Sequence, residues 1–204
     1  MTSAFKPVPD EQGKLSIEAL RAELLDLFCQ LAYKTGDFLL SSGLRSSYYI
    51  NGKLVTLDSQ GALAIGRLLL HQLPASAKAV AGLTLGADPI VTAISVVSAY
   101  ENRPIPGLIV RKEPKGHGTR AYIEGPVLPE DSEVVVVEDV VTTGQSALKA
   151  VERLRQAGYQ VNRVIALVDR QQGGTEAYAE LGLAFESVFK IDEIQTRWQE
   201  LHAG

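Results

Sequence analysis

The chain has 204 residues, of which 46% are hydrophobic and 22% are charged, and its formal net charge is −4. This length is enough for one domain with a sizeable core, and the composition is ordinary for a soluble globular protein. The negative net charge gives no general attraction to nucleic acid or to an anionic membrane. The single cysteine, Cys29, cannot form an internal disulfide, which favours a reducing, cytoplasmic setting.

The N-terminal quarter predicts a small group of elements laid on a larger core. Residues 1–14 carry two prolines and predict a loose arm. Ser16 is a predicted N-cap, and apolar residues at helical spacing follow it, so we expect an amphipathic helix over residues 17–33. Two short apolar runs within residues 36–51 flank a Ser/Gly turn, which predicts a hairpin.

Two adjacent aromatic residues, Tyr48 and Tyr49, stand in the second half of this hairpin. On a strand they would face opposite sides. One of them could stack on a flat ligand while the other packs inward, or both could serve as core or interface aromatics. The sequence leaves these alternatives open.

The rest of the chain, residues 56–204, alternates predicted helices and strands. This alternation predicts an α/β fold with a mainly parallel sheet flanked by helices. The predicted helices cover 59–73 (with Ser59 as N-cap), 90–100, 145–157, 175–182 and 191–202, and the predicted strands cover 79–81, 107–110, 134–137, 161–168 and 184–189.

One stretch carries the most chemistry. Residues 134–137 are four valines and read as a strand buried on both faces, which the acids Glu138 and Asp139 are predicted to end. A Thr-Thr-Gly turn at 142–144 follows, and Ser146 opens a helix. In an open α/β sheet, ligands bind at the carboxyl ends of strands, so this loop is a candidate site.

The residue types at this loop indicate a sugar phosphate. A turn that leads into a helix N-terminus offers backbone N–H groups and the positive end of the helix dipole, and hydroxyls within 142–146 add donors. Glu138 and Asp139 would repel a phosphate but can accept hydrogen bonds from a ribose diol. A solvated acid and a simple threonine N-cap is the plainer alternative.

Two further loops extend this site. Residues 82–88 follow a short strand, contain two glycines, and could hold a second anion such as a pyrophosphate. Residues 111–120 carry four fixed positive charges and one histidine between glycines, a composition suited to closing over a polyanion. Arg170 follows another strand and could offer its planar fork to a carboxylate or a carbonyl.

The acid pair with its Thr-Thr-Gly turn resembles the phosphoribosyl pyrophosphate (PRPP) motif of the type I phosphoribosyltransferases. The Arg-Lys-x-x-Lys-x-His-Gly run over 111–118, the hairpin and Asp169-Arg170-Gln171 resemble the branch of that family that uses orotate as acceptor. The resemblance implies transfer of the 5-phosphoribosyl group from PRPP to orotate, giving orotidine 5′-monophosphate and pyrophosphate in pyrimidine synthesis. It also implies a cytoplasmic homodimer in which the 111–120 loop reaches the partner's site.

The resemblance assigns roles to individual residues. It implies Lys112, Lys115, His117 and Asp139 as catalytic residues, and Tyr48, Tyr49, Thr142 and Arg170 as orotate-binding residues. It implies no direct metal ligand, because Mg²⁺ would arrive bound to PRPP. The implied PRPP-binding residues are Arg111, Lys112, Lys115, His117, Glu138, Asp139, Val140, Val141, Thr142, Thr143, Gly144, Gln145 and Ser146.

Two positions depart from some members of this branch, which carry lysines where Ser41 and Gly86 stand here. Two alternatives also stay open. One is a phosphoribosyltransferase that acts on a purine or on uracil. The other is a PRPP-sensing regulator that binds nucleic acid, although the net charge of −4 offers no basic footprint for it.

Overall fold

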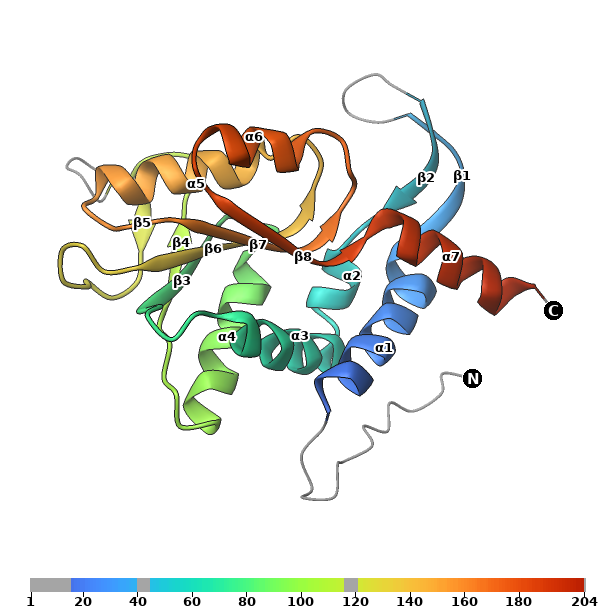
Figure 1. Cartoon of the computed structure of the whole chain (residues 1–204), viewed down its shortest axis with the longest axis horizontal. Coiled ribbons are helices and arrows are strands. Elements are labelled where there is room, and N and C mark those ends of the chain that lie inside the picture. The colour runs from blue at the N-terminus through green and yellow to red at the C-terminus, as the bar shows by residue number, and fades with distance from the viewer. Residues whose placement is uncertain (1–15, 40–44, 116–120, 204) are drawn as a thin grey trace.

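The computed structural model describes residues 16–39, 45–115 and 121–203 (Figure 1). The arm predicted for residues 1–14 lies outside these ranges. So do the hairpin tip with Ser41 and the part of the basic loop that contains His117.

A six-stranded sheet forms the centre of the molecule (Figure 1). Neighbouring strands are parallel throughout, except that the short edge strand β5 runs antiparallel to β4. The predicted mainly parallel α/β sheet is therefore confirmed. In spatial order the strands are β5 (Ile123–Glu124), β4 (Gly107–Val110), β3 (Ala79–Leu83), β6 (Val134–Val141), β7 (Arg163–Asp169) and β8 (Ala184–Lys190).

Helices cover both faces of this sheet, as Figure 1 shows. One face carries α5 (Gln145–Gln156) and α6 (Gly174–Glu180), and the other carries α1 (Ile17–Leu27), α3 (Ser59–Gln72), α4 (Asp88–Tyr100) and α7 (Ile191–His202). The valines of β6 divide between the two cores, with Val134 and Val136 on the α5 side and Val135 and Val137 on the other. All four are fully buried, as expected for a central parallel strand.

The predicted hairpin forms a separate two-stranded sheet of β1 (Tyr33–Leu39) and β2 (Arg45–Ile50). A π-helical turn, η1 (Phe28–Ala32), leads into it, and the short helix α2 (Lys53–Thr56) follows it. The hairpin rises beside the carboxyl-end side of the main sheet, next to α7 (Figure 1). It therefore places β2 where a loop of the core could share a ligand with it.

Three local expectations were wrong. The N-cap of α3 is Asp58, not Ser59, because the Asp58 carboxylate accepts hydrogen bonds from the N–H groups of Gln60 and Gly61 at 3.0 and 2.9 Å. The helix predicted over residues 17–33 changes to a π-turn at Phe28 and ends at Ala32. Strand β6 does not stop at the acids, since its pairing with β7 continues to Val141.

Among the described residues, no helix is both long enough and apolar enough to cross a membrane.

Candidate active site

The phosphate loop, residues 142–146, joins β6 to α5. Gly144 is the N-cap of α5 and has a φ of +80°, a conformation that side chains other than glycine adopt at a cost. No side chain among the described residues caps this helix by a hydrogen bond. The simple threonine N-cap is therefore not what forms, and the first N–H groups of α5 are left for another acceptor.

A pocket of about 100 Å³ lies over this loop. Its walls come from the end of β6, the whole phosphate loop and one residue of α6, Tyr178. The Tyr178 ring is fully buried, and its hydroxyl donates to the backbone carbonyl of Gly144 at 3.4 Å. A Cβ at Gly144 would lie 3.0 Å from that ring. Tyr178 thus supports the loop from below, so glycine is required both by the backbone angle and by the space.

Glu138 faces this pocket. It is only 6% exposed, and its Oε2 has no hydrogen-bond partner within the described part of the chain. Burial, reinforced by the neighbouring Asp139, raises the pKa of Glu138 well above its usual range, while the charge of Lys112 acts in the opposite direction. The side chain is therefore poised to gain a polar partner such as a hydroxyl.

Asp139 belongs to the other face of the same strand and meets the second predicted loop. A Cβ at Gly86 would lie 2.5 Å from the Asp139 Oδ1 atom, so the loop after β3 runs directly against this carboxylate. Within that loop the Thr84 hydroxyl donates to the Asp88 carboxylate at 2.7 Å. The absence of a side chain at Gly86 thus lets the two loops touch.

The structure brings Arg170 and Tyr48 together although 122 residues separate them. Arg170 Nε donates to the Tyr48 hydroxyl at 3.1 Å, and the guanidinium carbon lies 4.9 Å from the centre of the Tyr48 ring. The Nη2 atom of Arg170 is buried and finds no partner among the described residues. The backbone N–H of Arg170 also donates to Val141, directly before the phosphate loop, at 2.9 Å. A planar donor is therefore fixed beside the phosphate pocket.

Tyr49 behaves differently from Tyr48. It is 43% exposed and packs on Phe38, with ring centres 5.7 Å apart. The expectation that the two tyrosines face opposite sides is confirmed, and Tyr48 is the one turned toward Arg170. Thr142, the other residue of the implied orotate set, lines the phosphate pocket.

The described start of the basic loop is held by contacts that the sequence did not reveal. Arg111 Nη1 pairs with Glu124 at 3.1 Å, and Lys115 Nζ lies 3.8 Å from the same oxygen. Arg153 of α5 donates to the backbone carbonyls of Arg111 and, at 2.9 Å, of Lys112. Arg153 and Glu124 therefore fix the base of the loop.

Sequence reasoning missed Tyr178, Arg153 and Glu124. A tyrosine or arginine at helical spacing reads as a packing or surface residue, and an acid on a two-residue strand gives no periodic signal. Only the folded arrangement aims these side chains at a loop.

Comparison with known proteins shows the family of this chain. A family model for the phosphoribosyl transferase domain matches residues 70–200. The chain is 73% identical over 185 residues to the orotate phosphoribosyltransferase of Nostoc sp., covering 91% of this chain and 90% of that one. It is 65% identical to that of Synechocystis sp., covering 89% and 91% of the two chains. The chain belongs to the orotate phosphoribosyltransferase family.

Solved structures of the family have the same fold. The orotate phosphoribosyltransferase of Mycobacterium tuberculosis, solved with Fe(III) dicitrate, matches with a TM-score of 0.77 and 39% identity, covering 86% of this chain and 98% of that one. A structure of the Mycobacterium tuberculosis protein in complex with PRPP matches with a TM-score of 0.73 and 37% identity, covering 86% and 99%. The family resemblance read from the sequence is thus confirmed, and the chain is a transferase.

Proposed function

We propose that this chain transfers the 5-phosphoribosyl group of PRPP to orotate, giving orotidine 5′-monophosphate and pyrophosphate. The observation that carries the proposal is the guanidinium of Arg170. Its Nη2 atom is buried and has no hydrogen-bond partner among the described residues, and the backbone bond to Val141 fixes the residue next to the phosphate loop. A planar double donor suits the carboxylate or a ring carbonyl of an acidic pyrimidine.

The residues divide the work of the reaction among them. The phosphate loop and the N-terminus of α5 hold the 5-phosphate. Glu138 and Asp139, which lie on opposite faces of β6, accept hydrogen bonds from the ribose hydroxyls. The bond between C1 and the pyrophosphate oxygen breaks and pyrophosphate leaves with the electron pair. A ring nitrogen of orotate that has already lost its proton to solvent then bonds to C1 through its own electron pair. Tyr48 and Arg170 hold the orotate ring in line for that bond, which lowers the entropic cost of the reaction.

Basic side chains stabilise the leaving group. Arg111, Lys112, Lys115 and His117 are the residues proposed to meet the negative charge that develops on pyrophosphate. The contacts of Arg111 and Lys115 with Glu124 keep both cations near the site until a stronger anion competes for them. Both are at least one third exposed in these pairs, so the contacts are weak enough to exchange.

Mg²⁺ is the proposed cofactor, carried in on PRPP. Among the described residues no three His, Cys, Asp or Glu side chains gather into a metal site. The Asp139 carboxylate against the Gly86 loop offers oxygen atoms, the donor type that Mg²⁺ prefers, beside the expected place of the pyrophosphate. When bound, the ion supplies neutralising charge for the phosphate oxygens.

A homodimer that shares the 111–120 loop is part of the proposal. A groove of about 670 Å³ with mostly apolar walls adjoins the loop of residues 82–88, and Leu57, Leu85 and Val96 in it are more than half exposed. Exposed apolar surface of this kind favours burial against another protein surface. A second copy seated here would lie next to the site that its loop must reach.

We also propose a cytoplasmic setting and a single domain over residues 1–204, with residues 1–55 packed on the core of 56–204.

The first test is turnover. Purified protein with PRPP, Mg²⁺ and orotate should consume orotate, followed by its ultraviolet absorbance, and Lys115→Ala should lose most of this rate. Lys78→Ala is the matched control, because Lys78 is exposed just before β3, at the amino end of that strand and not at its carboxyl end. Turnover of uracil or a purine in place of orotate would contradict the proposed acceptor.

The second test addresses the shared loop. Lys115→Ala and Asp139→Asn chains are purified separately, mixed, and allowed to exchange subunits. A site built from two chains should regain up to about a quarter to a half of the wild-type activity, because one site of each mixed dimer is then intact. Activity that stays at the level of the separate variants counts against a shared loop.

A further inference from the structure

An unbroken line of aromatic contacts runs from Arg170 back to the C-terminal helix. The Tyr48 ring that receives the Arg170 hydrogen bond stacks on Tyr33 of β1, with ring centres 5.8 Å apart and planes 24° apart. Tyr33 in turn meets Trp198 of α7 edge-on, at 5.9 Å and 60°. Arg170 thus rests on Tyr48, Tyr48 on Tyr33, and Tyr33 on Trp198.

Tyr33 is the fixed middle of this line. It is only 6% exposed, and the polar side chain of Gln195, one turn before Trp198 on the same helix, is its neighbour. Burial raises the pKa of Tyr33, so the phenol stays neutral around pH 7. Two residues of α7 therefore set both the position and the tilt of the Tyr33 ring.

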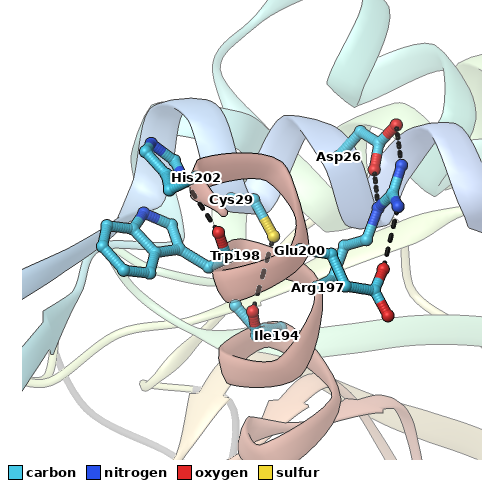
Figure 2. A network of polar contacts seen from close by, with 7 residues as sticks. All are labelled: Asp26, Cys29, Ile194, Arg197, Trp198, Glu200 and His202. Carbon is cyan, nitrogen blue, oxygen red and sulfur yellow. Dashed lines mark hydrogen bonds and ion pairs between the residues drawn. The ribbon is translucent and has the colours of Figure 1, made fainter. Parts of the chain in front are cut away.

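Helix α7 is itself anchored, as Figure 2 shows. Arg197 binds both carboxylate oxygens of Asp26 on α1, at 2.7 and 3.2 Å, and the Cys29 thiol donates to the Ile194 carbonyl at 3.5 Å. His202 stacks on Trp198 with ring centres 4.2 Å apart, so the indole is held on a second side. The far end of the aromatic line is thus a rigid support rather than a loose surface.

We propose that Tyr33 and Trp198 are positioning residues for the acceptor base, acting through Tyr48 to aim the guanidinium of Arg170. The inference rests on the proposed function. Apart from its backbone bond to Val141, Arg170 is held by its hydrogen bond to the Tyr48 hydroxyl and by its contact with the Tyr48 ring, so a shift of that ring redirects the planar guanidinium. Recognition by a planar double donor depends on angle more than a point charge does. Among the described residues, neither Tyr33 nor Trp198 lines the phosphate pocket, and their ring contacts are with Tyr48, with each other and with His202.

The test compares the KM for orotate with the KM for PRPP in each variant. Trp198→Ala and Tyr33→Leu should each raise the KM for orotate about tenfold while the KM for PRPP changes less than about twofold, because only the base contacts are misaligned. Trp198→Phe and Tyr33→Phe keep the aromatic contacts and should restore values near wild type. Gln195→Leu removes only the polar neighbour of Tyr33, and should raise the KM for orotate about threefold in a chain that still folds.

A destabilised control separates positioning from stability. Leu154→Ala truncates a fully buried residue near the far end of α5, and should lower the melting temperature without changing the ratio of the two KM values. The inference is overturned if the aromatic variants raise both KM values equally, or if Gln195→Leu and Tyr33→Leu leave the KM for orotate unchanged. If the wild-type chain does not turn over orotate, the proposed function and this inference fail together. If the wild-type chain is active but the variants raise both KM values equally, only this inference fails.

Discussion

The two halves of the active site are built in opposite ways. The phosphate side comes from one uninterrupted stretch, residues 138–146, with Tyr178 beneath it. The base side joins Tyr48 on the hairpin to Arg170 after β7, and it is supported by residues from both ends of the chain. One half depends on local backbone geometry, and the other depends on how distant elements pack.

This difference teaches where each half is vulnerable. A strand-turn-helix unit carries its own hydrogen-bond donors, so damage to it requires a change in its backbone. The base side depends on a series of side-chain contacts, so it can be altered by a substitution far from the ligand. The predictions below test this contrast.

The largest expected effect follows from a side chain at Gly144. Gly144→Val combines a positive φ with contact against the Tyr178 ring, so the phosphate loop must move, and kcat/KM for PRPP should fall about a hundredfold. Gly182→Val is the matched control, since φ there is +66° but a Cβ meets no atom within 4 Å. Steady-state kinetics on both variants give kcat/KM for PRPP. An equal loss of kcat/KM in the two variants would contradict a special role for the phosphate loop.

The next effect concerns the base side. Arg170→Lys keeps the charge but loses the planar fork, so the KM for orotate should rise about tenfold or more with little change for PRPP. Arg155→Lys serves as the control, because that guanidinium donates to the Val161 carbonyl, shortly before β7 begins. A parallel rise in the KM for PRPP would mean that the two halves are not separable.

A smaller effect is expected in the pH dependence of stability. The folded state raises the pKa of Glu138, so it binds a proton that the unfolded chain releases above its ordinary pKa near 4.5. The resulting stability is complete below that value and is lost as the pH rises toward the folded pKa, with a slope of at most about 1.4 kcal/mol per pH unit. Urea unfolding of ligand-free protein between pH 5 and 8 should give a flatter profile for Glu138→Gln. Identical slopes would mean that Glu138 is ionised in the fold.

The smallest effect concerns the support beneath the phosphate loop. Tyr178→Phe removes a hydroxyl whose bond to the Gly144 carbonyl is long, 3.4 Å, and keeps the ring. The KM for PRPP should rise only about twofold to fivefold, consistent with a bond worth about 1 kcal/mol or less. A loss as large as that of Gly144→Val would show that the hydroxyl, not the ring, holds the loop.

The sequence by itself determined the parts whose signal is local. Four consecutive valines predict a buried parallel strand, and the acid pair with Thr-Thr-Gly predicts a ribose-phosphate loop, because period and turn chemistry act within a few residues. The same locality explains the errors. Which of Asp58 and Ser59 caps α3, and where β6 stops, depend on side-chain direction and on pairing with β7, which composition does not reveal.

Only the tertiary structure decided which tyrosine of the pair faces the site, and that Gly86 lies against Asp139. It also decided that Tyr33 and Trp198 stand behind Tyr48. Tyr33 and Tyr48 are neighbours within the hairpin, but the other relations join residues more than a hundred positions apart or loops that follow different strands, and no periodicity along the chain encodes them. They arise because parallel strands bring their carboxyl ends to one edge and because α7 returns to pack on α1, so the packing of the whole chain sets them.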